Sequence, residues 1–207
     1  EVLKKSSFPV HILTKSRLVL RDLDLLEEIG RNTWSCVSVT ITASDPEIAR
    51  FLEPKSPSPQ TRFGVVAAIK ERAECIQAGV LLIPVVPYLA DSHEDLESLV
   101  KEAKEAGADY VLFGGAMTMR GQQALWFLKH LKESRPDLLS KYEELYNFAY
   151  EPGSYDGAYM AKDSYNIEIT RKFLDLREKY DMPYRIKRFI PGDFRADNYR
   201  IAEILLN

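Results

Sequence analysis

The sequence predicts an α/β protein built on a parallel sheet. Four short segments rich in apolar or β-branched residues alternate with stretches long enough to form helices. Those stretches carry apolar residues at helical spacing, and several begin or end at recognisable caps. Segment 78–84 is an almost continuous apolar run, which is typical of a strand covered on both faces. Repeated strand–helix alternation favours right-handed crossovers and therefore parallel strands.

The first two strands are expected at 9–14 and 35–42. The helix between them has Leu23 to Ile29 at helical spacing, with Gly30 as its stop. The second strand alternates strictly, with three branched residues on one face and a thiol and hydroxyls on the other. These residues are Val37, Val39 and Ile41 on the first face, and Cys36, Ser38, Thr40 and Thr42 on the second. Either a polar group lies against that second face, or this is an edge strand with one solvent-exposed face.

Capping residues place the later elements. Asp45 or Ser44 with Pro46, and Ser58 with Pro59, predict two helix starts before the third strand, 78–84. The next helix is expected from Ser92 to Gly107, followed by a fourth strand, 109–113, that runs into Gly114-Gly115. Helical patterns then cover 125–131 and 136–146.

The last 61 positions form a separate C-terminal extension in this interpretation. A loop rich in Tyr, Gly and Asp covers 147–165, and a helix carries Phe173 to Tyr180. A short strand-like piece is expected at 184–190 and a final helix at 196–206. The expected domains are a partial barrel, 1–146, and a loop and helical extension, 147–207.

Composition excludes several classes of protein. The 207 residues include 28 Lys and Arg against 31 Asp and Glu, a net charge of −3 that does not suit a non-specific nucleic-acid binder. No apolar run approaches the roughly 20 residues that span a bilayer, and no leader peptide opens the chain, so a cytoplasmic protein is expected. Two cysteines are too few to hold a zinc ion or an iron–sulfur cluster. The start at Glu1, in what reads as a helix under way, suggests that an upstream part is missing.

Candidate binding residues follow the strands, because ligands of parallel α/β sheets bind at the carboxyl ends of the strands. This rule nominates Lys15 and Ser16, the hydroxyls of the second strand, and Ile83. A lysine there can hold a carboxylate or phosphate, although a solvated lysine is an equal alternative. Glu53 and Arg62 are nine positions apart, a spacing more typical of a surface ion pair. The histidines show no metal-ligand spacing, and no catalytic or metal-binding residue is assigned.

Segment 184–200 is locally basic. Between Arg185 and Arg200 it holds five basic and two acidic residues, interleaved with aromatic ones. Such a pattern suits contact with a phosphodiester chain, but more often it is an amphipathic cover on a core. Nucleic acid is therefore a minor hypothesis for this segment.

Several motifs in one order resemble the radical S-adenosylmethionine (AdoMet) proteins related to spore photoproduct lyase. The resemblance covers about residues 8–116, and 183–207 is similar to the C-terminal tail of the family. The motifs are Val10–Ser16, Leu20-Arg21-Asp22, Leu25-Leu26, Val37–Thr42, Leu52-Glu53-Pro54, Ser58-Pro59 with Arg62, and Leu82–Pro87.

The resemblance implies a partial (βα)₆ barrel that holds AdoMet and a [4Fe–4S] cluster. In the family, the reduced cluster cleaves the sulfonium to methionine and a 5′-deoxyadenosyl radical. By position, Lys15 matches the lysine at the methionyl carboxylate, Thr40 the hydroxyl that binds the cofactor, and Ile83 the backbone at the adenine. Glu53 and Arg62 match a charged pair near the cofactor. Ser16 and Ser38 are added as neighbouring hydroxyls.

The family's three cluster cysteines, CxxxCxxC after the first strand, are absent from the 207 residues. The sequence is therefore interpreted as the later two-thirds of a radical AdoMet enzyme, an oxidoreductase or lyase, that is inactive alone and takes its cluster ligands from an upstream part. The alternative is a non-redox module that binds a nucleoside or phosphate, or a scaffold.

Overall fold

The computed structural model describes residues 1–187 and contains one sheet of four parallel strands, in the order β1-β2-β3-β4. The register places His11 opposite Cys36, and Cys36 opposite Gln77. The strands are β1 Val10–Thr14, β2 Ser35–Thr40, β3 Ile76–Leu82 and β4 Val111–Phe113. The predicted parallel α/β arrangement is confirmed. Because β2 lies between β1 and β3, the alternative of a wet edge strand is wrong.

Helices follow each strand, as expected, and one short helix precedes β1. They are α1 Val2–Lys5, α2 Leu23–Asn32, α3 Pro46–Leu52, α4 Pro59–Arg72, α5 His93–Glu105, α6 Gly121–Ser134, α7 Leu139–Tyr146 and α8 Asp163–Lys179, with 3₁₀ turns at Arg17–Asp22 (η1) and Pro136–Leu138 (η2). The predicted caps are present: the side chains of Asp45, Ser58 and Ser92 accept from backbone N–H groups of the first turns of α3, α4 and α5.

Gly30 does not end its helix, contrary to the prediction. Helix α2 continues to Asn32. A Cβ at Gly30 would lie 2.1 Å from the carbonyl oxygen of Cys75, so the glycine is needed for a close backbone approach rather than for a turn.

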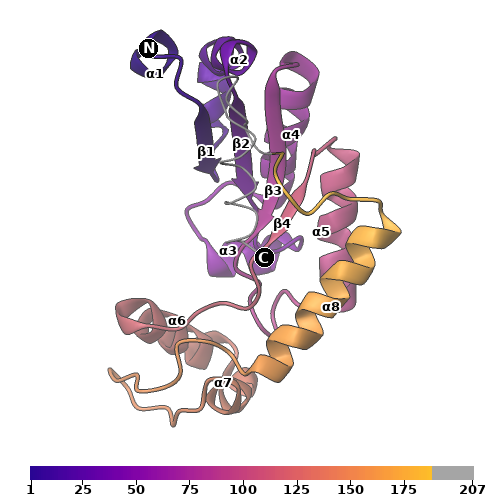
Figure 1. Ribbon diagram of the computed structural model, residues 1–207. Helices are drawn as coiled ribbons and strands as arrows, with labels where there is room; N and C mark the ends of the chain where they lie inside the picture. The colour runs from indigo at the N-terminus through magenta and orange to yellow at the C-terminus, as the bar shows by residue number, and fades with distance from the viewer. Residues whose placement is uncertain (188–207) are drawn as a thin grey trace, which may run out of the picture.

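One face of the sheet packs on the helices and forms the main core. The branched residues predicted for this face of β2, Val37, Val39 and Ile41, are 0–1% exposed and pack with residues of α2, α4 and α5. Helix α8 crosses back over this core, and the Phe173 ring stacks on that of Phe113 with 4.6 Å between centroids. Helix α8 is thus part of the cover of the sheet (Figure 1).

A second apolar cluster lies beyond the carboxyl ends of the strands. Helices α6 and α7 gather there below the sheet, with the segments after β3 and β4 between them and the strands (Figure 1). Tyr142 and Tyr146 are completely buried in it, and their hydroxyls donate to the carbonyls of Pro87 and Met117. These bonds hold the α6/α7 unit against the loops at the strand ends.

Two predictions for the tail extend outside the described residues: most of the piece at 184–190, and the whole helix at 196–206. Of the basic segment, only 184–187 is described; the Tyr184 ring lies 4.9 Å from the guanidinium carbon of Arg177 and 5.3 Å from that of Arg185. Within residues 1–187, no helix combines the length and apolar character needed to span a bilayer.

Candidate cofactor site at the ends of the strands

Three charged residues from separate elements meet where β1 and β2 end. Lys15 Nζ lies 2.5 Å from Glu53 Oε1, and Arg62 Nη2 donates to Glu53 Oε2. The Arg62 side chain is 2% exposed, that of Glu53 11% and that of Lys15 40%. A buried guanidinium, a nearly buried carboxylate and a half-exposed ammonium therefore form a chain that leads to the surface.

Arg62 fixes the backbone around this cluster. Its Nη1 donates to the carbonyl of Thr40 at 3.0 Å, and its Nε donates to the carbonyl of Pro57 at 2.9 Å. Arg62 is placed there because Ser58 and Pro59 start α4 just before it. The guanidinium therefore ties the end of β2 to the loop that carries Glu53.

The charge state of Glu53 depends on its two partners. Burial would raise the pKa of Glu53, but hydrogen bonds from Lys15 and Arg62 outweigh it and hold the pKa below its ordinary value of 4.5. A carboxylate with a lowered pKa keeps Lys15 in place at neutral pH. The Lys15 ammonium has three protons, one of which points to Glu53.

We expect Glu53 to contribute to acid sensitivity. A group whose pKa is lower in the folded state stabilises the fold above its unfolded pKa, and this contribution disappears as pH falls through the folded pKa. In Glu53→Gln, unfolding midpoints in urea should therefore decline less between about pH 6 and pH 3 than in the unchanged chain. Glu47→Gln, an exposed residue on α3, is the control and should keep the original slope. Identical slopes for Glu53→Gln and the unchanged chain would contradict this role.

Ser38 is placed away from this cluster, in a separate buried network. Its Oγ lies 2.5 Å from the Tyr110 hydroxyl and 2.7 Å from His11 Nε2, and Cys36 Sγ lies 3.1 Å from the same hydroxyl. The polar group expected against this face of β2 is therefore present, and it is a side chain of the protein itself. Burial raises the pKa of Cys36 to about 11 and lowers that of His11, so thiol and imidazole are neutral at pH 7.

Tyr110 was not predicted as a site residue. It is fully buried, and its ring lies over Gly79 of β3, where a Cβ would be 2.5 Å from the ring carbons. The signal in the sequence was a glycine inside an otherwise apolar strand, which marks a close approach by another group. Tyr110 covers this face of the sheet at the level of Ser38 and Gly79, on the amino-terminal side of Thr40.

The other two predicted residues border the cluster. Ser16 caps η1, with its Oγ accepting from the N–H of Leu18 at 3.1 Å. Ile83 follows β3, is joined to Pro84 by a cis peptide bond and is 41% exposed. A Cβ at Gly114 would lie 2.6 Å from Ile83 Cγ1, so Gly114 makes room for this side chain. The structure thus brings together Lys15, Glu53, Arg62 and the end of β2, with Ile83 exposed at the end of the next strand.

A cavity of about 330 Å³ adjoins Glu53 on the side of α6, and we call it the α6 pocket. Six of its lining residues are apolar and three are polar. They are Leu52, Pro84, Val86, Met117, Trp126 and Phe127, with Thr42, Glu53 and Gln123. Sequence reasoning named Thr42 on the polar face of the second strand but did not foresee this pocket.

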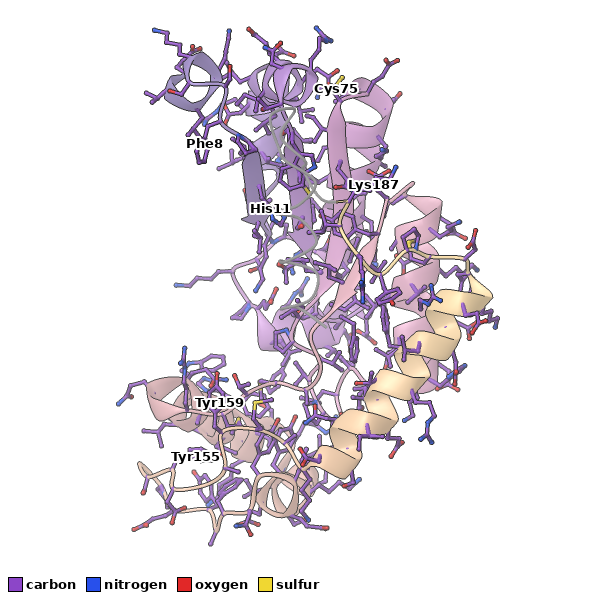
Figure 2. All side chains as sticks on the ribbon, viewed as in Figure 1. Phe8, His11, Cys75, Tyr155, Tyr159 and Lys187 are labelled. Atoms are coloured by element: carbon purple, nitrogen blue, oxygen red, sulfur yellow. The ribbon has the colours of Figure 1, made fainter. Side chains whose placement is uncertain are left out.

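The residues present do not fit an iron–sulfur cluster. Cys36 is buried in the Tyr110 network, and Cys75 lies at the opposite end of the sheet from the α6/α7 unit (Figure 2). Within residues 1–187, no group of three or more His, Cys, Asp or Glu side chains is arranged to hold a metal ion. The region does present a cation, Lys15, beside the exposed apolar side chain of Ile83 at the end of the next strand.

Sequence comparison finds relatives of this chain, but no known family profile matches it. Two uncharacterized proteins, of Mycobacterium tuberculosis and Mycobacterium bovis, are each 38% identical to it over 154 residues, which is 74% of this chain and 44% of theirs. The chain therefore spans less than half the length of these relatives.

Solved structures give the same fold. The four parallel strands and their helices match part of the barrel of a radical AdoMet enzyme, and the predicted fold class, a partial barrel with a helical C-terminal part, is confirmed. The enzyme is spore photoproduct lyase. A variant with its dinucleoside spore photoproduct matches with a TM-score of 0.57 and 17% identity, over 86% of this chain and 53% of that one. A variant that also holds AdoMet matches with a TM-score of 0.55 and 16% identity, over 86% and 52%.

Proposed function

We propose that this chain forms the AdoMet-binding part of a radical AdoMet enzyme. The observation that carries the proposal is the meeting of Lys15, Glu53 and Arg62 at the strand ends of a fold that also occurs in an AdoMet-bound enzyme. Ligands of parallel α/β sheets bind at that end. The cluster ligands would come from a CxxxCxxC segment elsewhere in a longer polypeptide.

Each residue has a separate task in this proposal. Lys15, half-exposed at the end of β1, binds the methionyl carboxylate. Glu53 orients Lys15, and Arg62 holds both Glu53 and the end of β2, which carries Thr40, in place. Ile83 and the backbone around it offer the apolar edge to the adenine. When bound, AdoMet supplies the sulfonium from which the family's adenosyl radical is made.

Replacing Lys15 tests this assignment. Calorimetric titration of the chain with AdoMet should give saturable binding, and Lys15→Met should weaken it by roughly tenfold or more, because a charge-assisted hydrogen bond is lost. Lys55→Met is the matched control, since Lys55 is exposed on the loop just after Glu53, and it should leave the affinity unchanged. AdoMet affinity that is insensitive to Lys15 would reject the proposed orientation of the cofactor.

A non-redox binding module is the second candidate, favoured by the presence of only two cysteines in the sequence. It differs from the first in its ligand. If ATP or AMP binds more tightly than AdoMet in the same titration, a phosphate or nucleoside module is supported. The radical-enzyme hypothesis is supported if the full-length protein contains a CxxxCxxC motif and forms 5′-deoxyadenosine after anaerobic iron–sulfide reconstitution.

A further inference from the structure

The α6 pocket lies directly beside the charged cluster. Glu53 belongs to both, and the pocket extends from it to Gln123, Trp126 and Phe127 in the first turns of α6. At about 330 Å³ it is at the small end of ligand sites, which run from about 300 to 1,000 Å³. It therefore has room for one ring system or a short apolar group.

The lining excludes a charged occupant. Among its lining residues in the described chain there is no Lys, Arg or His. Its one charged side chain, Glu53, is already paired with Lys15 and Arg62. An anion would meet the Glu53 carboxylate without a free cation to balance it, so the pocket favours a neutral group.

Trp126 gives the pocket a flat wall. Its ring is stacked on that of His130 with 4.1 Å between centroids, and His130 Nδ1 lies 2.8 Å from the Trp126 carbonyl. Trp126 is nevertheless 47% exposed. The stack with His130 restrains the indole, and the exposed part of the ring can stack against another planar ring.

Thr42 is a polar residue in the lining of the pocket. The residue is 6% exposed, and its Oγ1 is buried without a hydrogen-bond partner in the part of the chain that the structure describes. A buried hydroxyl without a partner is costly, and a ligand atom that bonds to it removes that cost. The occupant should therefore carry a hydrogen-bonding edge.

We propose that the α6 pocket binds a neutral planar heteroaromatic ring of the substrate, stacked on Trp126 and hydrogen-bonded to Thr42. Calling the ring part of a substrate rests on the proposed function, because it places the ring next to the AdoMet site. Binding of the ring itself does not require AdoMet, so the two proposals can fail separately.

Trp126 fluorescence measures this binding without any enzymatic activity. In Trp34→Phe, Trp126 is the sole tryptophan, since the sequence has two. Uracil is the probe, because it is neutral and planar and has carbonyl and N–H groups at its edge. Orotate, the same ring with a carboxylate, tests charge, and cyclohexanol, which has a hydroxyl but no planar ring, tests shape.

We expect saturable quenching by uracil, at least tenfold weaker binding of orotate, and no saturable response to cyclohexanol. Thr42→Val, which keeps the shape of the side chain, should weaken uracil binding about three- to tenfold, as expected for one hydrogen bond. Leu125→Ala alters a second cavity that also borders Trp126, and this variant should leave uracil binding unchanged. All of these titrations are carried out without AdoMet, which separates their result from the fate of the AdoMet proposal.

Four results would overturn the inference. They are equal binding of orotate, equal binding of cyclohexanol, loss of binding in Leu125→Ala but not in Thr42→Val, and competitive displacement of uracil by AdoMet. The last result would assign the pocket to the cofactor. Because Thr42→Val removes an unpartnered hydroxyl, its thermal midpoint should not fall, and its folding can be checked on the same sample.

Discussion

Replacing Arg62 with methionine is expected to lower the free energy of unfolding by about 3–5 kcal/mol, as for other broken buried ion pairs. Methionine fills similar space but leaves Glu53 without its buried partner and two backbone carbonyls without their donor. Urea unfolding monitored by circular dichroism gives the value. Arg50→Met, on the exposed side of α3, is the control and should change stability by less than about 0.5 kcal/mol.

Arg62→Lys separates charge from geometry. Lysine keeps the positive charge, but an ammonium cannot reproduce the forked contacts of a guanidinium to Glu53, Thr40 and Pro57. We expect most of the loss to remain. If Arg62→Met is as stable as the unchanged chain, Arg62 does not organise the site.

Gly79→Ala is expected to cost about 1–3 kcal/mol, because the new methyl group would overlap the Tyr110 ring in a fully buried place. The Tyr110 hydroxyl is held by Ser38 and Cys36, so the ring cannot move aside freely. Unfolding in urea measures the loss. In a Tyr110→Ala background the same substitution should cost much less, because the two side chains are coupled.

Gly64→Ala is the matched control. Gly64 lies within α4, and a Cβ there would have no atom within 4 Å. Alanine at an exposed helical position should raise stability by roughly 0.5–1 kcal/mol. If the two glycine substitutions have equal effects, the close approach of Tyr110 to Gly79 is not what requires glycine at position 79.

Local sequence signals predicted the strands and helix starts well, because each depends on a few neighbouring residues. The caps at Asp45, Ser58 and Ser92 are side-chain contacts within one turn, and the alternation in β2 follows from strand geometry. The position of Lys15 at a strand end was predictable for the same reason. The Glu53–Arg62 pair was found from its motif, although its burial was not expected from spacing alone.

Long-range packing decided what the sequence could not predict. Gly30 resembled a helix stop, but its role depends on the backbone of Cys75, which belongs to a later element. The hydroxyl of Ser38 suggested a ligand contact, but Tyr110, which directly precedes β4, reaches it across β3. The α6 pocket joins residues from three segments separated by whole helices, and no local pattern brings these segments together.

Mapping of AdoMet onto the isotope-labelled chain by amide chemical shifts is the most direct test of the central claim. We expect the amides that move to lie at the carboxyl ends of the strands, around Lys15, Thr40 and Ile83, and we expect Lys15→Met to reduce the shifts strongly at the same AdoMet concentration. Shifts gathered instead at the opposite end of the sheet, around Trp34, Cys75 and Gln77, would contradict it.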